Sequence, residues 1–230
     1  MNKILHLVME TPGANAASIL LEATQEDSPP PQFYFPNSSP LDQLNKHIWS
    51  LGNEGTEDCL EFNKPLNAPE IFMFLSHEIS LVDQLVSLTR FQASNDQITI
   101  GRVLLFVHSP ILLEKIDSFH EWIDAVVHFS DAILFVDRTN ENATAIKTLQ
   151  ERYSSMRYPL ENFFLSKKNN PWARILDPSP RRISHIFDDI ELLDPEDYPE
   201  NDVYFKKLPS GGHERKIPLI FKRHEDSFNS

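Results

Sequence analysis

Polar side chains that could carry chemistry follow the buried strands that the sequence predicts. Such strands are predicted by short apolar runs at 4–8, 71–75, 103–107 and 132–136. The residues that come next include Glu10, His77, His108 and Asp137. Because the carboxyl ends of parallel strands lie at one edge of a sheet, we expect these four side chains to converge there. Imidazoles and carboxylates in such a place could exchange protons near neutral pH or bind a divalent metal.

The first of these strands leads through Pro12-Gly13 into a predicted helix at 14–23. Free amide groups at the start of a helix favour an anion, so a phosphate or carboxylate ligand is expected at this edge. Two histidines would strengthen anion binding below about pH 6.5. The predicted ligand-binding set is Glu10, Gly13, Ser18, His77, His108 and Asp137. Ordinary polar loops in water would give the same pattern, so both interpretations stay open at this point.

A second group of possible ligands is weaker. His120, Asp124 and His128 are spaced by four residues and would share one helical stripe. That stripe lies opposite the apolar one, which predicts a solvated face. Cys59 is the single cysteine, so no intrachain disulfide can form, and no zinc-type cysteine spacing, His-Glu-x-x-His or Gly-x-Ser-x-Gly motif is present. We therefore assign no catalytic residue and expect neither a resident metal nor a cofactor.

The elements that must position these residues alternate between strand and helix up to about residue 167. This alternation predicts an α/β fold with a doubly wound, mostly parallel sheet. Helices are expected after Ser39-Pro40, through Leu41, Leu44, Ile48 and Leu51, and along Leu112, Ile116, Phe119, Ile123 and Val126. Residues 1–169 form the predicted main domain, and 170–230 form a proline-rich, charged C-terminal extension with one short helix near 182–193. The extension is expected to be a partner surface or to pack over the sheet.

Composition restricts the partners. The chain of 230 residues has 21 Lys and Arg against 34 Asp and Glu, a net charge of −13, so its field repels nucleic acid and anionic lipid. The apolar runs are far shorter than the ~20 residues of a membrane helix, and no export signal is visible. We expect a soluble, cytoplasmic protein that binds neither nucleic acid nor membrane. Another protein or a small anionic ligand remains as the partner class.

Local strings resemble the CobW-type metallochaperone GTPases, a branch of the P-loop nucleotide hydrolases. Gly13-Ala14-Asn15-Ala16-Ala17-Ser18-Ile19-Leu20 follows the first strand where that family has Gly-Ala-Gly-Lys-Thr-Thr-Leu-Leu. The resemblance implies that Ala16 stands in place of the phosphate-binding lysine and Ala17 in place of the magnesium-binding hydroxyl, which leaves only Ser18 nearby. It covers about residues 3 to 166 and implies a sheet of P-loop NTPase type.

The base-recognition segment has changed as well. Residues 129–139, Phe-Ser-Asp-Ala-Ile-Leu-Phe-Val-Asp-Arg-Thr, resemble the family's Phe-Ala-Asp-Val-Ile-Leu-Leu-Asn-Lys-x-Asp. Val136, Asp137 and Thr139 then replace the asparagine, lysine and aspartate that recognise guanine, and His108 stands at a family aspartate position. The family's Cys-x-Cys-Cys metal motif is absent. The resemblance therefore implies weak binding of GTP and ATP without turnover.

Three functions follow from these observations. The first is a P-loop-like protein that does not hydrolyse nucleotides and acts as a binding or regulatory module. The alternative is a metal- or histidine-dependent enzyme at the sheet edge around His77 and His108. A third, weaker resemblance links 3–8 and the turn that follows to the opening of GT-B glycosyltransferases, but the irregular remainder after residue 169 cannot supply the second domain such enzymes need.

Overall fold

The computed structural model describes residues 2–37, 47–52, 59–166, 170–209 and 214–222. Within these residues eight strands form one sheet in the order β4-β3-β2-β5-β1-β6-β7-β8. The strands are β1 Lys3–Glu10, β2 Gln32–Pro36, β3 His47–Gly52, β4 Cys59–Phe62, β5 Glu70–Phe74, β6 Ile98–His108, β7 Ala132–Val136 and β8 Glu161–Phe164. Every neighbouring pair is parallel except β3 with β4.

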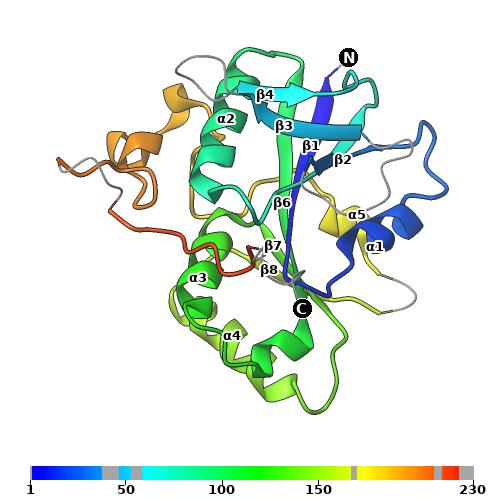
Figure 1. The fold of residues 1–230 in the computed structure, drawn as a ribbon, viewed down its shortest axis with the longest axis vertical. Helices are drawn as coiled ribbons and strands as arrows, with labels where there is room; N and C mark the ends of the chain where they lie inside the picture. Colours follow the sequence, from blue (N-terminus) through cyan, green and yellow to red (C-terminus); the bar gives the residue numbers. More distant parts are fainter. Residues whose placement is uncertain (1, 38–46, 53–58, 167–169, 210–213, 223–230) are drawn as a thin grey trace, which may run out of the picture.

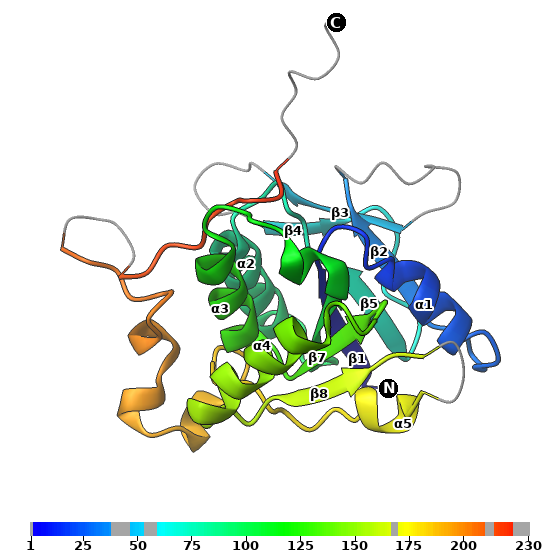
Figure 2. The ribbon, with the colours of Figure 1, turned by 90° about the horizontal axis from the view of Figure 1, so that it is seen from below.

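Helices cover both faces of this sheet (Figures 1 and 2). The helices are α1 Ala16–Ala23, α2 Leu81–Ala93, α3 Phe119–Phe129, α4 Ala143–Ser155 and α5 Trp172–Ile175. Side chains of α2, α3 and α4 belong to one buried apolar cluster, and side chains of α1 and α5 belong to a second cluster on the other face. The predicted doubly wound α/β fold is confirmed. Because both faces are covered, the central strands β1, β5, β6 and β7 are apolar on both sides.

The structure corrects the helix expected through Leu41 to Leu51. The first part of that segment lies outside the described residues, and the rest is strand β3. Trp49 is fully buried in this strand, and its indole N–H donates a 2.8 Å hydrogen bond to the Phe74 carbonyl. Pairing with β2 and β4 therefore makes this segment a strand, although the spacing of its apolar residues is that of a helix.

Two other helix predictions are too long. The helix expected along Leu112 to Val126 begins only at Phe119, because Ser109–Leu113 forms a 3₁₀ turn that contains a proline in its first turn. The helix expected near 182–193 is reduced to the 3₁₀ turn Ile190–Leu192, followed by the similar turns Pro195–Asp197 and Pro199–Asn201. Prolines at the start of the last two turns limit how far helical structure can extend.

The described part of the extension packs against the sheet domain. Asp131 is fully buried and accepts a 2.7 Å hydrogen bond from the Val103 amide, while Arg182 of the extension lies 3.2 Å from the same carboxylate. Phe187 and Tyr204 join the apolar cluster that α2, α3 and α4 build. A charged pair with no access to water must be well matched, so this contact fixes the extension to the amino end of β7. No helix among the described residues is long and apolar enough to cross a bilayer.

Candidate functional site

The loop between β1 and α1 has an unusual backbone. Gly13 has φ +87° and Asn15, which precedes α1, has φ +54°; both lie in the left-handed region. The Ala14 amide donates to the Thr11 carbonyl at 3.1 Å, and the Asn15 side chain donates to the Gly13 carbonyl at 3.1 Å. Asn15 does not cap the helix with its side chain. The amide at the helix start therefore needs another acceptor.

Glu10 provides that acceptor. Its carboxylate accepts a 2.9 Å hydrogen bond from the Ala16 amide, the first residue of α1. Burial raises the pKa of this carboxyl, and the hydrogen bond from Ala16 opposes that rise. The last residue of β1 thus folds back and places its own negative group at the helix N-terminus, where a bound anion would otherwise lie.

His108, at the end of β6, contacts the loop between β1 and α1 through both its backbone and its ring. Its backbone amide donates a 2.8 Å hydrogen bond to the Thr11 hydroxyl, and its ring lies against Gly13, where an added Cβ would be 2.7 Å from Nδ1. Its Nε2 lies 3.4 Å from an Asp137 carboxylate oxygen at the end of β7. The side chains of His108 and Asp137 remain 28% and 64% exposed, so this pair can meet a ligand from water.

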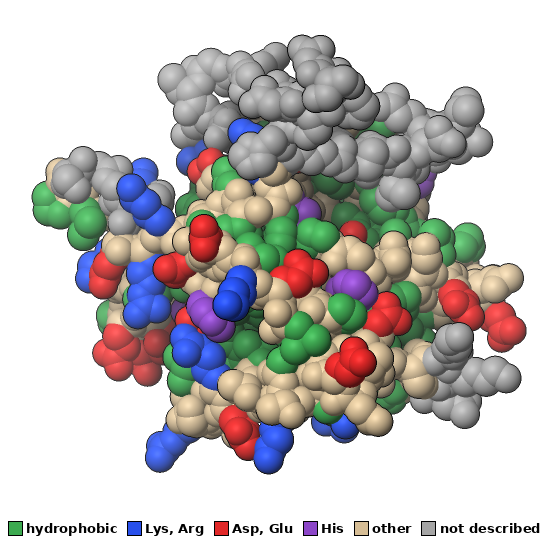
Figure 3. All heavy atoms as spheres, turned by 60° about the horizontal axis from the view of Figure 1, so that its bottom comes forward, with side chains coloured by type: hydrophobic (Ala, Val, Ile, Leu, Met, Phe, Trp, Pro, Cys, Tyr) green, Lys and Arg blue, Asp and Glu red, His purple; other side chains and the backbone are tan. Residues whose placement is uncertain are grey.

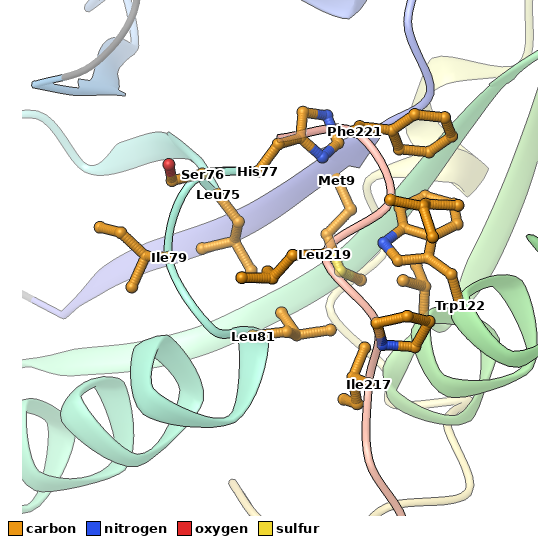
Figure 4. A pocket seen from close by; sticks show the side chains of 13 residues that line it. Met9, Leu75, Ser76, His77, Ile79, Leu81, Trp122, Ile217, Leu219 and Phe221 are labelled. Carbon is orange, nitrogen blue, oxygen red and sulfur yellow. The ribbon is translucent and has the colours of Figure 1, made fainter. Parts of the chain in front are cut away.

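His77 lies at the same edge but in different surroundings. It hydrogen-bonds the Glu10 backbone, and burial lowers the pKa of its imidazole, an effect that this bond and Glu78 oppose. Its ring lies 5.4 Å from that of Phe221 and 6.2 Å from that of Trp122 (Figure 4). The structure therefore brings Gly13, His108 and Asp137 into contact. Glu10 lies in the same loop but binds the Ala16 amide, and His77 reaches the loop through the Glu10 backbone beneath a covering segment.

Ser18 is separate from this group. It is exposed in the first turn of α1, and its side chain makes none of the contacts described above. Whether the predicted set binds a ligand stays a prediction.

Of the stripe His120, Asp124 and His128, only His120 is exposed as predicted, and the other two contact neighbouring elements. Asp124 accepts hydrogen bonds from Arg152 and, at 2.8 Å, from the Tyr153 hydroxyl of α4. His128 is buried and lies 2.8 Å from Asp202 of the extension. The two residues join α3 to its neighbours, which explains why polar groups occupy this side of the helix. Among the described residues no group of three or more His, Cys, Asp or Glu is arranged to hold a metal ion.

Two features of the edge escape the sequence analysis. The first is the segment 217–221, which covers the groove beside His77. Its sequence, Ile-Pro-Leu-Ile-Phe between charged residues, is an apolar signal from which this position could have been suspected. The second is the position of the Glu10 side chain. The strand pattern predicts that Glu10 lies at the edge of the sheet, but it does not predict that the carboxylate points back to α1.

On the face that Figure 3 draws, acidic and basic side chains of the described residues are interspersed and form no continuous patch of one sign.

Comparison with known proteins identifies a fold. No family model matches the chain, and no curated protein matches it. Among solved structures it is similar to the Zn(II)-bound YjiA GTPase from E. coli, with a TM-score of 0.51 and 10% identity over 79% of this chain and 67% of that one. The chain therefore has a P-loop NTPase-like fold, as an α/β protein with a mostly parallel eight-stranded sheet.

Proposed function

We propose that this chain is a P-loop-like protein that does not hydrolyse nucleotides and acts as a binding or regulatory module. The observation that carries the proposal is the hydrogen bond from the Ala16 amide to the Glu10 carboxylate. In the pattern Gly-x-x-x-x-Gly-Lys-Ser/Thr, Glu10 stands at the first glycine, Asn15 at the second and Ala16 at the lysine. The loop thus carries a negative charge of its own where the P-loop pattern has a positive one.

The electrostatic consequence is large. A phosphate oxygen that used the Ala16 amide would lie within about 4 Å of the Glu10 carboxylate, where two unit charges repel by about 4 kcal/mol at an effective dielectric constant of about 20. That energy weakens binding by about a thousandfold. The absent lysine and the hydroxyl replaced by Ala17 remove the attractive contacts as well. A closed loop of this kind favours a second protein over a nucleotide as the partner.

Calorimetry with GTP or ATP and magnesium tests this function. We expect no dissociation constant at or below about 1 μM, which corresponds to about −8.2 kcal/mol, and no release of phosphate over hours. A dissociation constant in that range would contradict the proposal, because it would mean that the loop binds nucleotide despite Glu10. The YjiA GTPase, which has a similar fold, measured in the same buffer serves as the positive control.

A second function, acid-base catalysis at the exposed edge, is favoured by one observation. His108 Nε2 and Asp137 lie 3.4 Å apart in contact with water, beside a carboxyl whose pKa is raised by burial. A thermal-shift screen of anions and divalent metals on the wild type and on His77→Ala with His108→Ala tests this edge. Stabilisation by a ligand that survives the double substitution would place the ligand elsewhere and remove this alternative.

A further inference from the structure

An apolar groove lies beside His77 at the carboxyl edge of the sheet. Its walls come from β1, the loop after β5, α2 and α3 (Figure 4). The wall residues include Met9, Leu75, Ile79, Leu81, Trp122 and Val126. The segment 217–221, which we call the strap, lies in this groove, and a cavity of about 30 Å³ remains between the strap and the walls. The apolar side chains of the strap therefore face apolar walls.

Among the described residues, contacts between side chains hold the strap. The Phe221 ring lies 4.9 Å from the Trp122 ring at 80°, an edge-to-face contact, and 5.4 Å from the His77 ring. The last backbone hydrogen bond before the strap joins Arg215 to Val203 at 3.0 Å. Within the described residues, no hydrogen bond connects 216–221 to another element. Leu219 is 43% exposed, so the strap can leave without breaking a strand ladder or a helix.

We propose that this groove is a docking site for an extended apolar segment of a partner protein, which the strap occupies in cis until the partner displaces it. The strap itself defines the chemistry of that segment: Ile-Pro-Leu-Ile-Phe, which forms neither helix nor strand. Its proline favours extended backbone, and a turn follows at Ile220 and Phe221. Recognition through apolar side chains of an extended peptide is an established mode of binding. The inference goes beyond the proposed function, because it holds whether or not the Glu10 loop binds an anion.

Docking of a partner segment would also affect the loop at Glu10, through His77. His77 touches Phe221 of the strap on one side and hydrogen-bonds the Glu10 backbone on the other. A segment that replaces the strap therefore changes what surrounds His77, and with it the loop that precedes α1. This contact connects the groove to the edge described above.

Tethering sets the size of the expected effect. A strap attached to the same chain competes at an effective concentration of the order of 1 mM. A free peptide with an intrinsic dissociation constant of about 0.1 mM then binds the wild type about tenfold more weakly than a chain whose strap is out of the groove. Removing the strap's contacts should therefore reveal the site.

The experiment uses full-length chains and a labelled synthetic peptide of residues 214–222. Fluorescence anisotropy compares the wild type with Phe221→Ser, and Leu192→Ser is the matched control because Leu192 is 83% exposed on the extension. We expect about tenfold tighter peptide binding to Phe221→Ser, no change for Leu192→Ser, and no binding of a peptide in which Leu219 and Phe221 are serine. Equal binding to all three chains, or none to any, would overturn the proposal.

Folding and self-association have their own controls. Circular dichroism checks that Phe221→Ser is folded, and the milder Phe221→Ala takes its place if it is not. Gel filtration across protein concentrations tests whether the occupant is a second copy of the chain. A dimer that the peptide disperses would assign the groove to that second copy and overturn the partner that we propose.

Discussion

Replacing Glu10 tests whether one carboxylate keeps anions out of the loop. In Glu10→Gly the Ala16 amide loses its acceptor and the loop loses its negative charge. The repulsion of about 4 kcal/mol at 4 Å and an effective dielectric constant of about 20 disappears, so pyrophosphate should bind up to about a thousandfold more tightly. Glu10→Gln should give part of this gain, because its amide oxygen can still accept from Ala16 but carries no charge.

Isothermal titration with pyrophosphate measures the gain. Glu22→Gln is the matched control, since Glu22 is an exposed carboxylate on the same helix away from the loop, and it should bind no better than the wild type. Salt dependence should fall in the Glu10 variants if charge is the cause. If Glu10→Gly and Glu10→Gln are folded and still bind pyrophosphate as weakly as the wild type, the reasoning from Glu10 is wrong, and the lack of a lysine at position 16 is enough to explain the weak binding.

Three further predictions concern stability, each measured by urea unfolding. Gly13→Ala should cost about 1–3 kcal/mol because of its positive φ and its contact with His108, and adding His108→Ala should recover only the steric part. Asp131→Asn should cost about 1–3 kcal/mol by removing the buried one of the two carboxylates that pair with Arg182, since Asp188 still lies 2.9 Å from it, against less than about 1 kcal/mol for Glu151→Gln in an exposed pair. The pKa of His77 is lowered in the folded state, so the folded wild type binds this proton less readily than the unfolded chain and should lose stability as the pH falls from 6.5 toward the lower pKa. His77→Asn should remove this loss, and a variant with the same pH profile as the wild type would contradict the assignment.

The central sheet could be predicted because its strands carry their own signal. Strands buried on both faces are mostly apolar, and the runs before Glu10, His77, His108 and Asp137 have that property, with His6 as the one polar residue in the first of them. The topology of parallel strands then brings the residues that follow to one edge, so the juxtaposition of Glu10, His108 and Asp137 follows from local patterns.

The remaining features depend on contacts between distant segments. β3 has the apolar spacing of a helix, and only its pairing with β2 and β4 and the burial of Trp49 make it a strand. His128 was expected in water because its helix alone was considered, whereas Asp202 of the extension covers it. The position of the strap likewise depends on a groove that four other parts of the chain form. Periodicity along the chain contains none of this information.

Introducing a lysine at position 16 alone should not create nucleotide binding. A P-loop without phosphate leaves the first amides of its helix without an acceptor, and Glu10 supplies one to Ala16. In Ala16→Lys the new ammonium group would lie next to that carboxylate and pair with it, since Ala16 is itself fully buried and a buried charge requires a partner. We therefore expect Ala16→Lys to bind pyrophosphate no better than the wild type. The double variant Glu10→Gly with Ala16→Lys should gain more binding free energy than the two single variants gain together. A double-mutant cycle by calorimetry measures the coupling. Additive effects would show that Glu10 and residue 16 act independently, and the loop would then not be closed by its own carboxylate.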